Sequence, residues 1–539
     1  MRTLRTHRSG QRPGYYCENK LNPAGAAGRE SFGHPLRGAF CFCTGLLCCL
    51  LLTCLSARKS FAGTGYYDFN GLCQHAYHLI LEMKIDSGME LAAQEQKVHP
   101  GNLIPSLVEN EADFFVMFFS EDPSLYQVRM VQFDRRLRQL ESEGDAKSPW
   151  YLFSLGAGYF QRALICIKFQ ENWTAAWEFR KAYFLLRTNA ERFPGFAPDH
   201  YLLGGMETVI GTLPGAYKWA SEIMGMSGTI GGGMKELRNF IQDSSTAGKI
   251  FRLEGNLYYA YLDFFIENKH QEVFRFIREH HFDLKENELS VFLVANLSIN
   301  RQQGEYGLGV MKGFRMDNSY FPIPFLEDEF GTLELDRLQL DSADFYLTRF
   351  IRSFRGKFYL RDALLKLSRS EYLNGDLVLA NQFRALIRVR GNAETDADKA
   401  ALRESRARWP NILLLKARLL CDGGYFQRAT DLLKNVQVTD FSLQGDKLEY
   451  AYRMARLYDL EGKSSLAIPF YSATVRMGSD RPEYFAARSA LELGEIYERA
   501  GKSTLALSFY RQVLEMNEQE YKNSLDQRAR AGINRVIGK

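Results

Sequence analysis

Apolar residues recur every three to four positions along most of the chain, and no segment keeps a strict apolar–polar alternation. The first period places side chains on one face of an α-helix, whereas alternation would predict strands. The pattern therefore predicts an all-α protein. One dense apolar stretch, "FFVMFF" (residues 114–119), is too short to cross a bilayer and is expected to form the buried core of a helix.

Four segments in the second half of the chain align when they start at Arg361, Pro410, Leu448 and Ala487. The residues in column eight are small, those in column fifteen are glycine, those in column twenty are alanine, and those in column twenty-four are large. The four columns hold Ser368, Ala417, Ala455 and Gly494; Gly375, Gly424, Gly462 and Gly501; Ala380, Ala429, Ala467 and Ala506; and Arg384, Leu433, Tyr471 and Tyr510. Agreement at four columns indicates an internal repeat.

Each column has a physical reason in a pair of antiparallel helices. Small residues in columns eight and twenty let the helices approach closely, and the large residue in column twenty-four fills the space beside them. Glycine in column fifteen supplies the left-handed backbone that ends the first helix. The pattern resembles the tetratricopeptide (TPR) repeat, which implies a solenoid of helical hairpins.

The repeats start 49, 38 and 39 residues apart, whereas TPR units are usually about 34 residues long. Residues 390–409 are therefore expected to be an insertion in the first gap. The last segment, residues 520–539, is expected to be a polar-faced capping helix, which the end of a solenoid needs for solubility. With "LLKARLLCDGGYFQRA" and "DKLEYAYRMARLYDLEGK", the C-terminal half resembles exported bacterial TPR proteins of undescribed activity.

The N-terminal half repeats less cleanly. Three segments predict TPR-like hairpins with decayed columns, in which Ala92 and Ala176 occupy column twenty and Gly304 is the turn glycine. Between Met316 and Leu333, Pro322 and Pro324 stand with four acidic residues, and this segment is expected to be a loop.

A glycine-rich segment, residues 196–248, separates the two halves. It lacks the Lys-Ser/Thr pair of a phosphate-binding P-loop, because Met234 follows the last glycine of "GTIGGG". Charged residues interrupt every apolar run in it, which argues against a membrane hairpin. We expect a joint of three short helices: "GGMETVIGTL", "GAYKWASEIMGM" and "GGGMKELRNFIQ". Residues 195–245 also resemble part of a eukaryotic TPR family linked to clearance of lipid and protein inclusions, a resemblance that places no catalytic residue on this chain.

The first 62 residues look like an export signal. They hold nine of the chain's 68 Lys/Arg and two of its 64 acidic residues, ahead of and around an uncharged apolar run at 39–55. Cleavage after Ala62 is the first expectation, and an uncleaved anchor or lipidation at Cys54 are the alternatives. The length of the leader is compatible with translation that starts downstream of Met1. Without these residues, 59 bases face 62 acids, which argues against a nucleic-acid binder.

The sequence predicts five parts: 1–62, a signal peptide or membrane anchor; 63–195, degenerate TPR-like hairpins; 196–248, the glycine-rich joint; 249–345, hairpins with a Pro/acidic loop; and 346–539, the C-terminal TPR array with its capping helix. Outside the first part only Cys73, Cys166 and Cys421 remain. Three widely spaced cysteines form neither a disulfide framework nor a zinc site.

Candidate chemistry is sparse. His75, His78 and Glu82 fall on one helix face, but no fourth ligand is evident and an interhelical polar contact is the simpler interpretation. The acids of "LEDEFG" (326–331) and "ETDAD" (394–398) are expected to be solvated residues in a loop or at a helix start. His280 and His281 are expected at a helix end. The sequence therefore predicts no catalytic residue, no metal site and no cofactor.

The concave groove of a TPR array is lined by first-helix positions two, five, nine and twelve. Position nine holds Arg369, Arg418 and Arg456 in three successive repeats and Glu495 in the fourth. With Asn411 at position two and Tyr452 at position five, these residues form the predicted peptide-binding groove. Stacked arginines suit capture of carboxylates on an extended peptide or polymer. The alternative is that they pair with neighbouring acids on a solvated face. Because position nine is not a packing column, little effect on folding is expected from exchanging them.

Taken together, the sequence predicts an exported, non-enzymatic TPR scaffold that binds protein or peptide partners in the cell envelope or periplasm of a Gram-negative bacterium. The chain is expected to contact the membrane only through its N-terminal segment, if that segment is uncleaved or lipidated. Two alternatives remain open: an envelope hydrolase or transferase with a site at the joint, sensitive to changes at Glu207 or Lys235, and a helical lipid- or glycan-binding protein.

Overall fold

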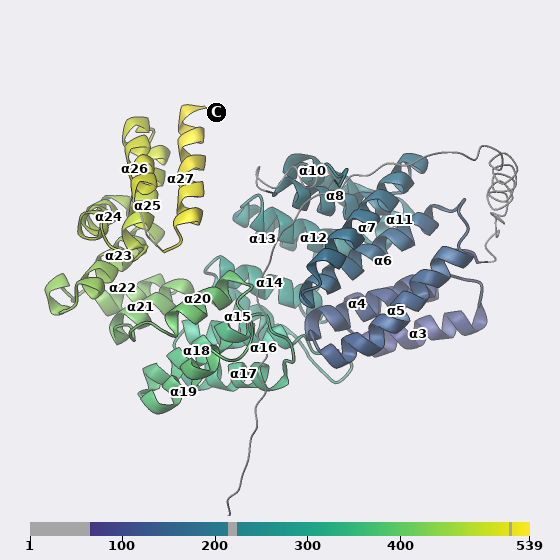
Figure 1. Cartoon of the computed structure of the whole chain (residues 1–539), viewed down its shortest axis with the longest axis horizontal. Coiled ribbons are helices and arrows are strands. Elements are labelled where there is room, and N and C mark those ends of the chain that lie inside the picture. Colours follow the sequence, from purple (N-terminus) through teal and green to yellow (C-terminus); the bar gives the residue numbers. More distant parts are fainter. Residues whose placement is uncertain (1–64, 214–223, 517–519, 539) are drawn as a thin grey trace, which may run out of the picture. The chain divides into compact units, whose positions relative to one another are not determined.

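A computed structural model describes residues 65–213, 224–516 and 520–538. The regular structure of the described residues is helical, with turns and irregular loops between the helices and one isolated bridge between Tyr66 and Asn102 (Figure 1). The predicted all-α class is confirmed. The N-terminal half has helices α2 (Gly71–Leu81), α3 (Ile85–Val98), α4 (Ile104–Ser120), α5 (Pro123–Glu143), α6 (Pro149–Lys168), α7 (Asn172–Arg192), α8 (Pro198–Gly211), α10 (Ile230–Gln242) and α11 (Thr246–Ile250).

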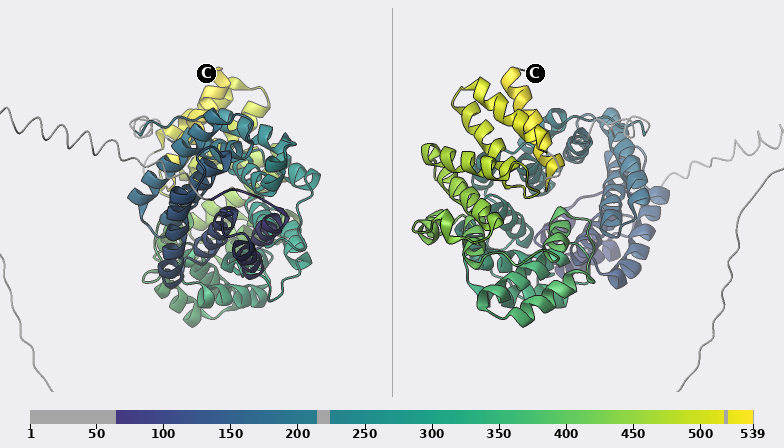
Figure 2. Two further views of the ribbon diagram at one scale, coloured as in Figure 1. Left: turned by 90° about the vertical axis from the view of Figure 1, so that its right-hand side faces the viewer. Right: turned by 60° about the vertical axis from the view of Figure 1, so that its left-hand side comes forward.

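The chain continues through α12 (Arg252–Phe265), α13 (His270–Glu279), α14 (Glu288–Asn300), α15 (Gly304–Gly313), α16 (Pro324–Asp336), α17 (Leu340–Ser353), α18 (Leu360–Asn374), α19 (Leu377–Ile387), α20 (Asp396–Glu404), α21 (Ile412–Asp422), α22 (Phe426–Leu433), the 3-10 turn η1 (Val438–Asp440), α23 (Gln444–Leu460), α24 (Ser464–Gly478), α25 (Phe485–Arg499), α26 (Ser503–Glu515) and α27 (Lys522–Ile537). Many consecutive helices pack side by side, as α6 with α7 and α26 with α27 do in Figure 1. Figure 2 shows the C-terminal helices, in yellow, from two further sides.

The four C-terminal hairpins are α18/α19, α21/α22, α23/α24 and α25/α26. Their turn glycines are all left-handed, with φ of 89° at Gly375, 83° at Gly424, 75° at Gly462 and 69° at Gly501. The small residues of columns eight and twenty and the large residues of column twenty-four are buried in every hairpin. The predicted repeat register is therefore confirmed.

The same geometry occurs in the N-terminal half without turn glycines. Hairpins α2/α3, α6/α7, α14/α15 and α16/α17 turn at left-handed residues Met83, Gln170, Gln302 and Leu338 (φ 60–71°). Seven residues before and five residues after each turn, small buried residues meet at the helix crossing: Ala76 and Gly88, Ala163 and Ala175, Ala295 and Gly307, and Gly331 and Ala343. TPR-like hairpins therefore extend through both halves.

This register corrects three predictions for the N-terminal half. Ala92 is buried one helical turn beyond column twenty, which Gly88 occupies. Ala175, and not Ala176, is the small residue at the crossing of α6 and α7. Gln302 provides the left-handed turn, while Gly304 is the first residue of α15. A glycine is expected at each turn from the C-terminal columns, whereas these turns place an L-residue in the left-handed region.

Replacing Gln170 with glycine tests this turn geometry. A non-glycine residue costs roughly 1–2 kcal/mol in the left-handed region, and the greater freedom of glycine in the unfolded chain offsets part of the relief. We expect a net stabilisation of about 0.5–1 kcal/mol, measured as an increase in the urea concentration at the unfolding midpoint. Gln170→Ala retains the strain and should not stabilise. Equal effects of the two substitutions would contradict the assignment.

The segment 316–333 was expected to be a loop, and its second half is a helix. Pro324 is the first residue of α16, where its missing N–H costs no hydrogen bond. Asp328 and Glu329 are consequently buried in α16 and not solvated. In "ETDAD", the expected helix start is present, since Thr395 caps α20. Asp398 is nevertheless buried, and its carboxylate accepts hydrogen bonds from the backbone N–H of Tyr359 and Arg361 at the start of α18.

The glycine-rich joint contains α8 and α10, and most of the expected middle helix lies in 214–223, outside the described residues. α8 starts at Pro198, earlier than the glycine pair at which a helix was expected to begin. A Cβ on Gly204 would lie 2.8 Å from the carbonyl oxygen of Gly233, and a Cβ on Gly211 would lie 2.5 Å from the backbone N of Ile230. These glycines allow two helices to touch through their backbones.

The predicted boundaries after residues 248 and 345 fall within α11 and α17, and the predicted signal segment 1–62 lies outside the described residues. "FFVMFF" belongs to buried α4, and His280 follows the end of α13, as expected. None of the described helices is both long and apolar enough to cross a membrane.

Candidate functional site

The predicted groove arginines lie on the first helices of three repeats, and each contacts a carboxylate. We call Arg369, Arg418 and Arg456 the arginine ladder. Arg369 lies 2.5 Å and Arg418 lies 3.5 Å from oxygens of Glu404. Arg456 lies 3.3 Å from Glu492 and 3.7 Å from Asp459. Along the ladder, each arginine side chain is therefore paired with an acidic side chain of the same chain.

These arginines are not freely solvated. Their side chains are 11%, 31% and 22% exposed, for Arg369, Arg418 and Arg456 respectively. The structure thus differs from the expectation that position nine contributes little to folding. An arginine in such a site supports the neighbouring carboxylate, and its removal leaves a partly buried charge without a partner.

Glu404 is the acid that joins two rungs of the ladder, and it comes from α20 in the inserted segment. Burial alone would raise the pKa of Glu404, but the guanidinium groups of Arg369 and Arg418 outweigh it and lower the pKa to about 2. The backbone carbonyl of Glu404 also accepts a hydrogen bond from Arg384 at 2.7 Å. The acid that pairs with Arg369 and Arg418 thus comes from α20, which lies outside the repeat hairpins.

The last two repeats continue the same alternation. Buried Glu492 lies 2.6 Å from Arg488, on the side opposite its contact with Arg456. Burial opposes ionisation of Glu492, yet Arg488 and Arg456 together lower its pKa. Glu495, the predicted fourth member of position nine, pairs with Arg528 of the capping helix at 2.8 Å.

Two further predicted groove residues have structural roles. Tyr452 is buried against Tyr484 and Phe485, with ring centroids 5.8 Å and 5.2 Å away. Asn411 is the N-cap of α21, and its side-chain oxygen accepts hydrogen bonds from the backbone N–H of Leu413 and Leu414. Asn411 also lines a pocket at the start of α21.

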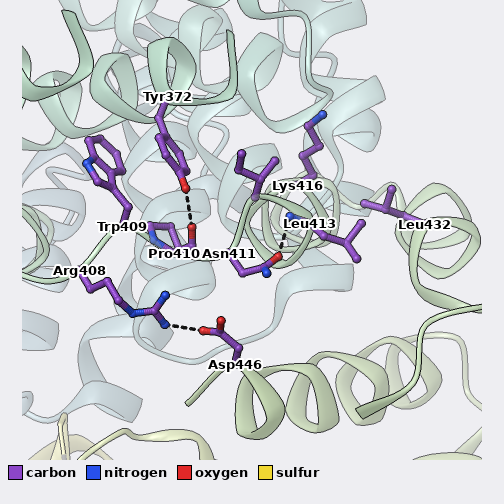
Figure 3. Close-up of a pocket in the computed structure, with 10 residues that line it drawn as sticks. Tyr372, Arg408, Trp409, Pro410, Asn411, Leu413, Lys416, Leu432 and Asp446 are labelled. Carbon is purple, nitrogen blue, oxygen red and sulfur yellow. Dashed lines mark hydrogen bonds and ion pairs between the residues drawn. The ribbon is translucent and has the colours of Figure 1, made fainter. Parts of the chain in front are cut away.

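That pocket has a volume of about 550 Å³ and is lined by residues from the first three C-terminal hairpins and the segment before α21 (Figure 3). The indole of Trp409 stacks on Tyr372, with centroids 4.3 Å apart, and Tyr372 donates a hydrogen bond to the carbonyl of Pro410. Arg408 pairs with Asp446 at 2.5 Å. Lys416 completes the lining with a second positive charge.

The residues considered for metal binding or catalysis lie apart from one another. His78 pairs with Glu82 at 3.0 Å, and within the described ranges no three His, Cys, Asp or Glu side chains gather as a metal site. Cys73, Cys166 and Cys421 are free and buried. In the joint, Lys235 is exposed, Glu207 is half-buried and His200 lies 3.0 Å from Glu236.

Glu404 and Trp409 are not predicted by the sequence pattern. Both lie in the segment treated as an insertion, so no repeat column pointed to them. The "WP" dipeptide directly before a repeat was an available signal. Tryptophan side chains are usually mostly buried, so a tryptophan in a linker indicates that the linker packs against the repeats. Glu404 offered no signal, since its partners are brought to it only by the stacking of two repeats.

No known family model matches the chain, and no curated protein matches its sequence. Among solved structures, the TPR domain of P58(IPK) is similar with a TM-score of 0.21 and 16% identity, over 80% of this chain and 98% of that one. The Cut9–Hcn1 hetero-tetramer of APC/C gives 0.21 and 11% identity, over 86% and 95%. A circular tandem repeat protein of novel repeat topology gives 0.18 and 14%, over 87% and 96%.

These similarities are too weak to indicate a partner or an activity. The fold assignment rests on the chain's own geometry: a left-handed turn residue, small buried residues seven positions before and five after it, and antiparallel helices that cross there. This combination recurs in both halves of the chain. The protein is an all-α repeat protein built from TPR-like helical hairpins.

Proposed function

We propose that the protein is a non-catalytic scaffold that binds an extended acidic segment of a protein partner along the arginine ladder. Arrays of helical hairpins present extended surfaces of this kind to other proteins. The observation that supports the proposal is the position of Glu404 between Arg369 and Arg418. The carboxylate of Glu404, which comes from a helix outside the repeats, contacts both arginines.

The partner's acid would replace Glu404 at the ladder. Guanidinium groups bind carboxylates in a fixed, often bidentate geometry, so an exchange of one carboxylate for another conserves the contacts. Glu404 is 30% exposed, and α20 belongs to the inserted segment and not to a repeat hairpin.

A fluorescein-labelled peptide of alternating Glu and Gly, titrated by fluorescence anisotropy, tests this proposal. We expect Glu404→Gln to tighten binding, because it frees two guanidinium groups, and Arg418→Gln to weaken binding. A charge-assisted hydrogen bond contributes roughly 1.5–3 kcal/mol, which corresponds to about tenfold or more in Kd. Circular dichroism of each variant confirms that it is folded.

Lys434→Gln is the matched control for Arg418→Gln. It removes one positive charge from the same repeat, but Lys434 is exposed and pairs only locally, with Asp431 at 2.8 Å. Its effect on peptide binding should be small. A folded Glu404→Gln protein that binds no more tightly than wild type would show that the ladder is a structural salt-bridge network.

The absence of catalysis is part of the proposal. The competing interpretation is a hydrolase or transferase site at the joint, where Glu207 and Lys235 are the residues to change. Activity profiling of the purified protein should show no turnover that depends on either residue. Turnover lost in Glu207→Gln or Lys235→Met would favour an enzyme.

We also propose that the chain is exported to a bacterial cell envelope, on the basis of the apolar run at 39–55 and its basic leader. N-terminal sequencing after expression should give a chain that begins near Gly63. A chain that begins at an acylated Cys54 would make it a lipoprotein, and a full-length cytosolic product would contradict export.

A further inference from the structure

A cavity of about 520 Å³ lies between α4, α12, α14 and α16 in the N-terminal half of the array. Its walls are mainly aromatic, with Phe118 from α4, Tyr258, Tyr261 and Phe265 from α12, and Phe292 from α14. Two of these aromatic residues are partly accessible, since Tyr261 is 49% and Phe265 is 38% exposed. Its volume lies within the range of small-molecule sites, which are roughly 300–1,000 Å³.

One wall carries an incompletely paired acid. Glu329 is 5% exposed, and its Oε1 accepts a hydrogen bond from Asn296 at 2.9 Å. Its Oε2 is buried and has no hydrogen-bond partner among the described residues. Burial raises the pKa of Glu329 well above its usual range, and the bond from Asn296 opposes this only in part. A buried polar group without a partner is costly, and a bound ligand can supply the missing contact.

The other charged residues at the cavity already have partners. Asp328 lies 3.1 Å from the ammonium of Lys366. Lys168 lies 2.8 Å from Glu121. Glu254 accepts hydrogen bonds from the hydroxyls of Tyr77 and Tyr201. Both of these bonds reach Glu254 Oε2. Among the acids that line the cavity, Glu329 is the one with a buried oxygen that has no hydrogen-bond partner.

The aromatic rings already receive one cation from the chain itself. The ammonium of Lys168 lies over three rings, 4.6 Å from the centroid of Phe118, 5.2 Å from Phe358 and 5.3 Å from Phe325. Ring faces carry negative potential and attract cations most strongly where water is excluded. The cavity likewise places aromatic rings beside a carboxyl group, that of Glu329, and this arrangement can bind a second cation from outside the chain.

We propose that this cavity binds an amphiphilic organic cation. The Glu329 carboxyl group gives up its proton to solvent when the ligand binds, the ammonium group donates to Oε2, and the hydrocarbon chain packs against the rings. An anionic amphiphile fits poorly, because Glu254, Asp328 and Glu329 all line the cavity and both nearby lysines are paired. A neutral alcohol fills the apolar volume but gains nothing from the ring faces. This site is separate from the arginine ladder in sequence and in chemistry.

Isothermal titration calorimetry of the full chain with decylammonium, decanol and decanoate, each below its aggregation concentration, tests the proposal. We expect decylammonium to bind at least about tenfold more tightly than either of the others, the scale of a desolvated cation–aromatic contact. Glu329→Gln should weaken decylammonium binding by a similar factor and leave decanol binding unchanged. Tyr261→Leu, which keeps apolar volume at an exposed position, should also weaken decylammonium binding selectively.

Glu288→Gln is the matched control, since Glu288 is also fully buried with an unpartnered Oε2 but does not line the cavity. It should leave all three affinities unchanged. Decanoate binding as tightly as decylammonium, or no binding by any of the three, would overturn the proposal. Butylammonium, a mimic of a lysine side chain, should bind far more weakly; equal binding would show that the hydrocarbon chain is not recognised and would likewise overturn it.

Discussion

Replacement of Tyr510 with alanine is expected to destabilise the C-terminal end of the array by roughly 3–5 kcal/mol, the cost of emptying a large buried aromatic site. Tyr510 is fully buried in column twenty-four of the last repeat. Its ring fills the space between Gly494 of α25 and Gly532 of α27, where a Cβ on either glycine would lie 2.5 Å from ring atoms.

The loss should be local, because stability in a repeat array is the sum of unit and nearest-neighbour terms. Limited proteolysis should cut the variant first within α25–α27 and spare the N-terminal hairpins. Leu505→Ala, on an exposed position of the same helix, is the control and should behave as wild type. Tyr510→Phe keeps the packing, loses only the hydroxyl bond to Glu498, and should cost about 1 kcal/mol. A Tyr510→Ala protein as protease-resistant as wild type would contradict the packing role of this column.

Exchange of all three ladder arginines for glutamate is expected to unfold the C-terminal array, and not merely to abolish partner binding. At Arg456 the change would place a third carboxylate beside Glu492 and Asp459, and breaking a buried ion pair costs roughly 3–5 kcal/mol. At Arg369 and Arg418 the exchange would replace both cationic partners of Glu404 with carboxylates. The far-ultraviolet circular dichroism signal and the melting curve report this directly.

The variant Arg456→Gln gives the graded form of the same test, since Glu492 retains Arg488 as a partner. It should melt earlier than wild type but remain folded at room temperature. If the triple Arg→Glu protein melts at the same temperature as wild type, the three arginines are solvated and have no structural role.

The ladder also predicts how stability changes with pH. The pKa of Glu404 is about 2 in the folded protein, below its ordinary value of about 4.3 in an unfolded chain. The contribution of Glu404 to stability is therefore complete above about pH 5 and is lost as the pH falls towards 2. Glu404→Gln should remove this part of the acid sensitivity. An unchanged acid-unfolding profile in Glu404→Gln would contradict the pairing.

How far the sequence predicted the fold depended on which residue makes the turn. Glycine marks the left-handed position in the C-terminal repeats, so Gly375 and its counterparts located the register. The same left-handed conformation is imposed by the surrounding packing on Met83, Gln170, Gln302 and Leu338. These residue types do not predict a left-handed turn. The helices were therefore predictable in the N-terminal half, while their register was not.

The candidate sites were less predictable than the fold. Position nine correctly located Arg369, Arg418 and Arg456 on the first helices, but their partners Glu404 and Glu492 depend on contacts between elements. Proline in 316–333 suggested a loop, although Pro324 starts a helix that buries Glu329. Glu329 became a candidate ligand group only through the aromatic residues that α4, α12 and α14 bring around it.

The most direct test of the proposed function is hydrogen–deuterium exchange of the full chain with and without the alternating Glu-Gly peptide. If the peptide replaces Glu404 at the ladder, amides of α20 should exchange faster when it is bound, while those of α18 and α21 should exchange more slowly. The shifts should disappear in Arg418→Gln. Unchanged exchange in α20 at peptide concentrations that saturate binding, or protection confined to other helices, would contradict binding of an acidic segment at the arginine ladder.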